Sequence, residues 1–81
     1  MNIFVARLSY NTSEPQLRDA FENFGTVDSV KIIFDREQGR SKGFGFVEMP
    51  NDDEANAAIA QLHDSELDGS QIVVKQSEPR N

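Results

Sequence analysis

Residues 42–49, Lys-Gly-Phe-Gly-Phe-Val-Glu-Met, constrain the fold most strongly, because they predict a strand with apolar side chains on both sides. Side chains alternate along a strand, so four of them share one side: Lys42, Phe44, Phe46 and Glu48. Val47 and Met49 take the other side. A strand of this kind needs cover on both faces of its sheet, or cover on one face and a ligand on the other.

The two glycines of this segment point to a close backbone neighbour. A glycine inside a strand weakens it and often marks the approach of another backbone. Gly43 and Gly45 lie opposite the Phe side chains. We therefore expect a helix to pass close to the strand on that side.

The other side offers a cation, two rings and a carboxylate. A cation can meet a phosphate and each ring can stack on a base, so this pattern suits unpaired nucleic acid. A chain of 81 residues has few apolar side chains to spare from its core. Exposed Phe residues therefore indicate a function.

Length and composition predict one compact domain over residues 1–77, followed by a short tail over 78–81. The chain has no cysteine, which agrees with a reducing compartment and excludes disulfides and Cys-based metal sites. Its first residues read as a strand, without a charged leader and a long apolar run. We expect a cytoplasmic protein without a membrane segment.

A formal net charge of −6 argues at first against a nucleic-acid ligand. The distribution of charge changes this interpretation. Residues 12–25 and 49–69, taken as helices with their adjoining loops, hold 9 of the 14 acidic side chains and Arg18 as their only Lys or Arg. The predicted sheet is thus mildly basic, and stacking and base contacts should matter more than phosphate attraction.

Turn residues and apolar spacing predict the order strand, helix, strand, strand, helix, strand. Ser13 with Gln16, and Asn51 with Glu54, have the spacing of capping boxes. The predicted segments are strands over 2–8 and 27–34, a polar hairpin loop over 35–41, the strand at 42–49, and a last strand marked by Ile72 and Val74. Two amphipathic helices can cover only one side of a small sheet, which leaves three rings outside: Phe4, Phe44 and Phe46.

With this element order, the chain resembles the RNA recognition motif (RRM) family, and in particular small bacterial proteins with a single such domain. Residues 42–49 match its eight-residue ribonucleoprotein motif except at Met49, which we expect to face the core. Residues 3–8 match its six-residue motif except at Arg7, where the family usually has Asn. The resemblance implies an α+β, ferredoxin-like βαββαβ sandwich. Its antiparallel sheet has the order 4-1-3-2, with both helices on one face.

The resemblance also implies roles on the open face. Phe4 and Phe46 would stack on two successive bases, Phe44 would pack against the sugars between them, and Lys42 would contact phosphate. By alternation or proximity, the following residues would border the rings: Lys31, Ile33, Val73, Lys75, Arg40 and Arg7. The implied partner is single-stranded RNA, with single-stranded DNA as a second candidate, in post-transcriptional regulation or RNA chaperoning.

Other functions have weaker support. The Phe face could serve as a protein-binding or weak homodimer surface, since exposed aromatic patches also mark protein contacts. No nucleophile has a base beside it in a recognisable motif, so we expect no catalytic residue, no cofactor and no enzymatic activity. His63 has no Cys or carboxylate at ligand spacing, so we expect no metal site.

Overall fold

The computed structural model describes residues 1–35 and 40–77, and of residues 34, 35 and 40–42 only the backbone is described. The predicted tail over 78–81 and the centre of the predicted hairpin loop lie outside this range. The elements are β1 (Asn2–Ala6), α1 (Glu14–Glu22), β2 (Ser29–Asp35), β3 (Arg40–Glu48), α2 (Asp52–Leu62), β4 (Glu66–Leu67), β5 (Ser70–Gln71) and β6 (Val73–Ser77).

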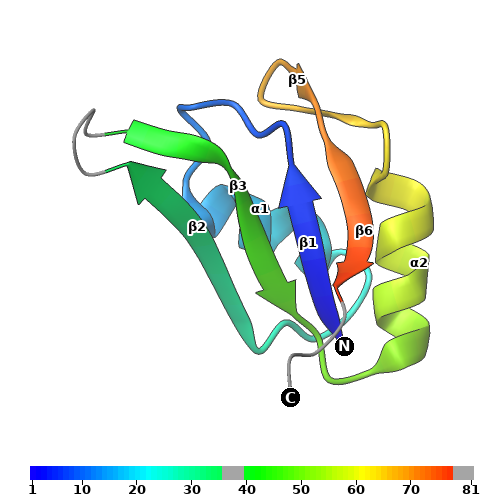
Figure 1. Cartoon of the computed structure of the whole chain (residues 1–81). Helices are drawn as coiled ribbons and strands as arrows, with labels where there is room; N and C mark the ends of the chain where they lie inside the picture. The colour runs from blue at the N-terminus through cyan, green and yellow to red at the C-terminus, as the bar shows by residue number, and fades with distance from the viewer. Residues whose placement is uncertain (36–39, 78–81) are drawn as a thin grey trace.

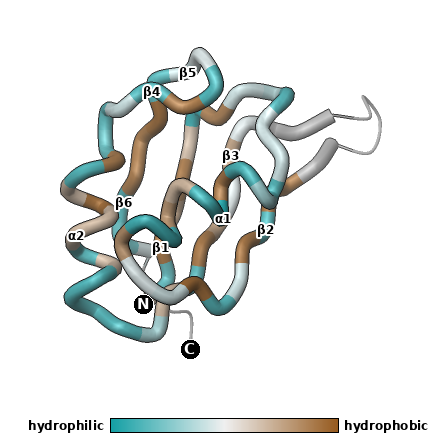
Figure 2. Tube along the Cα trace, turned by 180° about the vertical axis from the view of Figure 1, so that it is seen from behind, coloured by the Kyte–Doolittle hydropathy of each residue, from teal (hydrophilic) through white to brown (hydrophobic). Residues whose placement is uncertain are grey.

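The main sheet is antiparallel and has the order β2-β3-β1-β6 (Figure 1). Counted over the four main strands and read from the other edge, this is the predicted order 4-1-3-2. In Figure 2 both helices lie on the same side of the sheet, with α1 near β2 and α2 near β6. The predicted ferredoxin-like sandwich is confirmed.

The core lies between the helices and one face of the sheet. It consists of the following buried side chains: Ile3, Val5, Leu8, Leu17, Phe21, Val27, Ile32, Val47, Met49, Ala55, Ala58, Ile72 and Val74. Met49 is fully buried, as expected from its place opposite the Phe side chains. Both helices pack on this face of the sheet, and neither helix covers the opposite face.

Both helix starts follow the predicted capping residues, but only one forms the full box. At α1 the Ser13 hydroxyl accepts from the Gln16 N–H, and the Gln16 side chain accepts from the Ser13 N–H. At α2 the Asn51 side chain accepts from the Glu54 N–H. The Glu54 carboxylate instead accepts from the backbone N–H of Thr26, at 3.2 Å. Glu54 thus joins α2 to the loop after α1.

The expected approach of a helix to the strand glycines is wrong, because their nearest neighbours are the backbone of β2 and of the segment that follows β1. A Cβ on Gly45 would clash with the carbonyl oxygen of Lys31 in β2. A Cβ on Gly43 would lie 3.4 Å from the carbonyl oxygen of Leu8, and Gly43 has a φ of +84°. Gly45 therefore permits close pairing of β3 with β2 beside an irregularity in their register at Ile33, whereas Gly43 permits a positive φ.

Several strand boundaries differ from the prediction. β1 ends at Ala6, because Arg7 has a φ of +60° and turns the chain out of the sheet. β2 begins at Ser29, after the buried Val27. Strand pairing includes both Asp35 and Arg40, so the loop predicted over 35–41 is shortened by residues at both of its ends.

The β4–β5 hairpin was not predicted. It joins two short strands through Asp68 and Gly69, which have φ values of +53° and +82°. Two successive positive φ values are required by a type I′ turn, for which Asp-Gly is a favoured pair. The last main strand then starts at Val73, one residue after Ile72.

The outer edges of the sheet are contacted by side chains at the helix ends. On edge strand β2, the N–H of Ile32 donates to the carboxylate of Glu14, at 3.1 Å. On edge strand β6, the N–H of Val74 donates to Nδ1 of His63, also at 3.1 Å. Exposed edge donors can pair with other chains, so these contacts protect the edges at one point each. No helix within residues 1–35 and 40–77 has the length and hydrophobicity to cross a membrane.

Candidate nucleic-acid interface

The strand register aligns side chains into rows across the open face of the sheet, which is the face opposite the helices. Lys31 pairs with Phe46, Phe46 with Phe4, and Phe4 with Lys75. We call these four residues the stacking row. Its two rings lie on the central strands, and its two cations lie on the edge strands.

The three rings form one aromatic cluster. The ring centroid of Phe4 lies 5.6 Å from that of Phe46 and 6.0 Å from that of Phe44, and both pairs are tilted. Phe46 is 39% exposed, while Phe4 and Phe44 are partly buried by their neighbours. The cluster therefore presents ring surface to solvent while holding its members in place.

Lys31 and Lys75 are exposed, and within the described part of the chain neither forms an ion pair. Their ammonium groups therefore remain available to phosphates on both sides of the rings. The other two predicted cations, Arg40 and Lys42, belong to β3, but their side chains lie outside what the structure describes.

The remaining predicted site residues lie toward one end of the rows. Val73 pairs with Ala6, which pairs with Phe44, and Val73 is partly buried. Ile33 is partly buried at the register irregularity and has no direct partner in β3. Arg7 is exposed beyond the end of β1, so alternation does not assign it to the open face.

A second row lies two residues along each strand from the stacking row. Ser29 pairs with Glu48, Glu48 with Asn2, and Asn2 with Ser77. We call these four residues the polar row. None of its four members was among the predicted site residues, although Glu48 was expected on the same side of the strand as Phe44 and Phe46. Alternation could have placed them on the open face, but only the register shows that they lie side by side.

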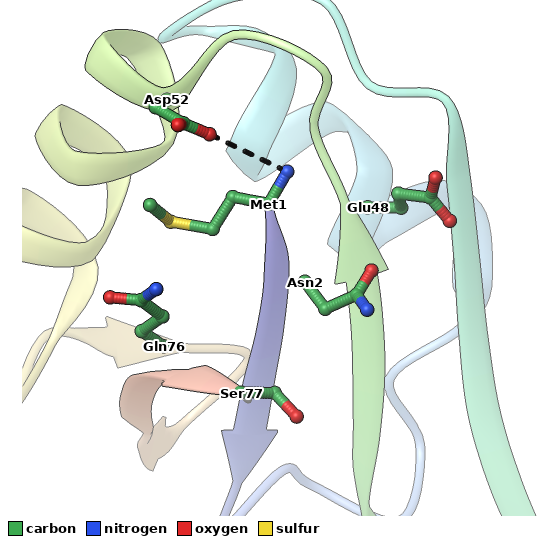
Figure 3. A pocket seen from close by; sticks show the side chains of 6 residues that line it. All are labelled: Met1, Asn2, Glu48, Asp52, Gln76 and Ser77. Atoms are coloured by element: carbon green, nitrogen blue, oxygen red, sulfur yellow. Dashed lines mark ion pairs between the residues drawn. The ribbon is translucent and has the colours of Figure 1, made fainter. Parts of the chain in front are cut away.

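The polar row borders a shallow cavity of about 380 Å³ at the end of the sheet. Figure 3 shows the side chains that line it: Met1, Asn2, Glu48, Asp52, Gln76 and Ser77. The Met1 amino group donates to the carbonyl oxygen of Met49 at 2.6 Å and lies 3.7 Å from a carboxylate oxygen of Asp52. Five of the six lining residues thus have polar side chains, and two of these are carboxylates.

His63 takes part in structural contacts at the end of α2. Besides accepting from Val74, it places Nε2 3.4 Å from a carboxylate oxygen of Asp64. Within residues 1–35 and 40–77, no group of three or more His, Asp or Glu side chains could hold a metal ion. These contacts account for His63 without a ligand.

The fold and this face define a class of protein: an α+β sandwich whose open sheet carries aromatic rings between cations. Residues 3–73 match the model of the RNA recognition motif, and the chain belongs to this family. RNA binding is the function that this membership supports.

Comparisons with individual proteins agree. RbpB of Nostoc sp. is 44% identical over 80 residues, which are 99% of this chain and 78% of that protein. Glycine-rich RNA-binding protein 2, mitochondrial, of Arabidopsis thaliana is 45% identical over 78 residues, 96% of this chain and 49% of that protein. The chain spans only 45–58% of the length of three of the curated relatives that it matches.

Solved structures show the same fold. The crystal structure of RNA Binding Protein PG1 matches with a TM-score of 0.93 and 43% identity, over 100% of this chain and 98% of that chain. The Rna15 RRM with bound RNA (GU) matches with a TM-score of 0.86 and 27% identity, over 96% of this chain and 83% of that chain.

Proposed function

We propose that this protein binds single-stranded RNA on the open face by stacking bases on Phe4 and Phe46. The observation that carries the proposal is the stacking row, in which two neighbouring rings are flanked by Lys31 and Lys75. Each ring can stack on a base of any kind, and each stacked base contributes about 1–3 kcal/mol.

The other predicted residues have supporting roles in this proposal. Phe44 packs against the sugars between the two stacked bases, and Lys42 contacts a phosphate, as the family motif implies. One or two neighbouring cations, such as Lys31, Lys75 or Arg40, contribute further phosphate contacts. Ile33 and Val73 border the rings, and Arg7 contacts RNA from the end of β1. A site of about two to four nucleotides fits a single small sheet.

We place this binding in post-transcriptional regulation or RNA chaperoning in the cytoplasm, and without catalysis. Post-transcriptional regulation and RNA chaperoning both fit a small RNA-binding domain. Two of its relatives in Arabidopsis thaliana are named as mitochondrial proteins, so fractionation of the native cell is the direct test of location. Single-stranded DNA is a second ligand to compare, because stacking does not need a 2′-hydroxyl.

The test is titration of a fluorescent RNA oligomer with the protein and its ring variants. Phe4→Ala and Phe46→Ala should each weaken binding by about 10- to 100-fold, and Phe44→Ala by less. Leu67→Ala is the matched control, because it removes a partly buried apolar side chain that packs on the core from β4. Unchanged affinity in folded Phe46→Ala would overturn the proposal.

Light scattering separates this proposal from a homodimer that uses the same rings. We expect a monomer with and without RNA. A stable dimer that persists in RNA, together with RNA affinity that does not depend on the rings, would instead indicate a protein-binding face.

A further inference from the structure

The polar row differs from the stacking row in a way that matters for an anionic ligand. Its centre is the carboxylate of Glu48, and its other members, Ser29, Asn2 and Ser77, are uncharged. A carboxylate on a face that binds phosphates repels the backbone of the nucleic acid. Hydrogen bonds that the carboxylate accepts from the ligand would offset this cost.

Glu48 is free to accept such bonds. Its side chain is exposed, and among the described residues it has neither an ion-pair nor a hydrogen-bond partner. The same is true of the Asn2 side chain, directly across on β1. Directly opposed residues on paired strands have Cβ atoms about 4.5–5.5 Å apart, so the two groups can reach one base together.

The polar row also lies close enough to the stacking row to contact the next base of the same strand. Asn2 lies two residues from Phe4, and Glu48 lies two residues from Phe46, on the same face. Two residues along a strand span about 7 Å. The cavity beside this row provides room at the end of the sheet for a base that continues from the stacked pair (Figure 3).

The chemistry of the two side chains selects a base. A carboxylate accepts through both of its oxygens, and an amide both donates and accepts. Only guanine presents two adjacent donors, N1–H and the N2 amino group, beside an acceptor, O6. In adenine and cytosine the amino group adjoins a ring-nitrogen acceptor, and in uracil the single N–H lies between two carbonyl oxygens, so each would place an acceptor against a Glu48 oxygen.

We propose that the polar row reads a guanine next to the stacked bases. The two Glu48 oxygens accept from N1–H and from the N2 amino group, and the Asn2 amide donates to O6. This inference rests on the proposed RNA binding and names a base-discriminating residue for it. Glu48 is then a specificity determinant that contributes little to total affinity, because its charge opposes the phosphates.

The test uses U-rich hexamers with one guanine placed at each position in turn, compared with inosine at the same position. Inosine keeps N1–H and O6 but lacks the N2 amino group. The wild-type protein should prefer guanine to inosine, and guanine to each other base, by about 5- to 10-fold at one position. In Glu48→Gln both preferences should largely disappear, while affinity for the all-U hexamer stays equal or rises.

Glu66→Gln is the control, because it makes the same change of charge on the separate β4–β5 hairpin and should keep the preference. A wild-type protein that binds through Phe46 without preferring guanine, or a preference that persists in Glu48→Gln, overturns this inference alone. Binding of the all-U hexamer that does not depend on Phe46 overturns the proposed function instead.

Discussion

Phe4 of β1 and Phe46 of β3 face each other directly across the centre of the sheet, with ring centroids 5.6 Å apart and planes tilted by 54°. The pair lies on the face that the helices leave uncovered, where Phe46 is exposed and Phe4 is partly buried. We therefore expect the pair to contribute to stability in the absence of a ligand.

The first prediction is that the two rings stabilise each other in the absence of RNA. An aromatic pair contributes about 0.5–1.5 kcal/mol beyond the area that it buries. A double-mutant cycle with Phe4→Ala and Phe46→Ala, measured by urea unfolding, should give a coupling free energy in that range. Additive effects of the two substitutions would show that the rings contact without mutual stabilisation.

The second prediction concerns salt. If two to three cations contact phosphates, the slope of log affinity against log salt should be about −1.4 to −2, using about −0.7 for each phosphate of a single strand. Lys31→Ala, Lys75→Ala and Lys42→Ala should each reduce its magnitude by about 0.7, and Phe46→Ala should leave it unchanged.

Arg18→Gln is the control for this series, because Arg18 lies on α1 and contacts the Val27 carbonyl oxygen and Glu22. Its slope should equal that of the wild type. A slope several times steeper, or one that Lys42→Ala does not alter, would show that the phosphates take another path.

The third prediction concerns Arg7, which departs from the family pattern and has a φ of +60°. The left-handed region costs most residues about 1–2 kcal/mol, whereas Asn tolerates it. Arg7→Asn should therefore raise the free energy of unfolding by about 1 kcal/mol. Arg7→Lys keeps the charge and should leave stability unchanged; a destabilised Arg7→Asn protein would contradict this account.

The fourth prediction compares two glycines. Gly45→Ala pushes a methyl group against the carbonyl oxygen of Lys31, so it should cost about 1–3 kcal/mol and displace β2. Gly69→Ala meets open space and should cost only about 1 kcal/mol, from its φ of +82°. RNA affinity should fall in the first variant, because Lys31 moves, and persist in the second. Equal effects on both properties would contradict the close contact of β2 and β3.

The fifth prediction concerns the sheet edge at His63. His63→Ala removes the acceptor of the buried Val74 N–H, so it should destabilise the protein by about 1–3 kcal/mol. His63→Asn offers an oxygen near the position of Nδ1 and should restore much of the loss. Hydrogen exchange at Val74 provides the local measurement, and protection that is unaffected by His63→Ala would rule out this role.

Several features followed from the sequence because they depend on neighbours in the chain. The cap at Ser13 involves residues three apart, and the apolar spacing around Leu17 and Phe21 is set by the helical period. Alternation along residues 42–49 separates the ring face from the core face in the same way. These local rules, with two motifs of the family, were sufficient for the element order and the sheet.

The tertiary structure decided what depends on pairing between distant segments. Gly45 meets β2 rather than a helix, and Glu54 turns from its own helix cap to Thr26, because both contacts join residues that are far apart in the sequence. The polar row has the same origin. Alternation assigns Glu48 and Asn2 to a face, but only the register of β1 against β3 places them opposite each other beside the rings.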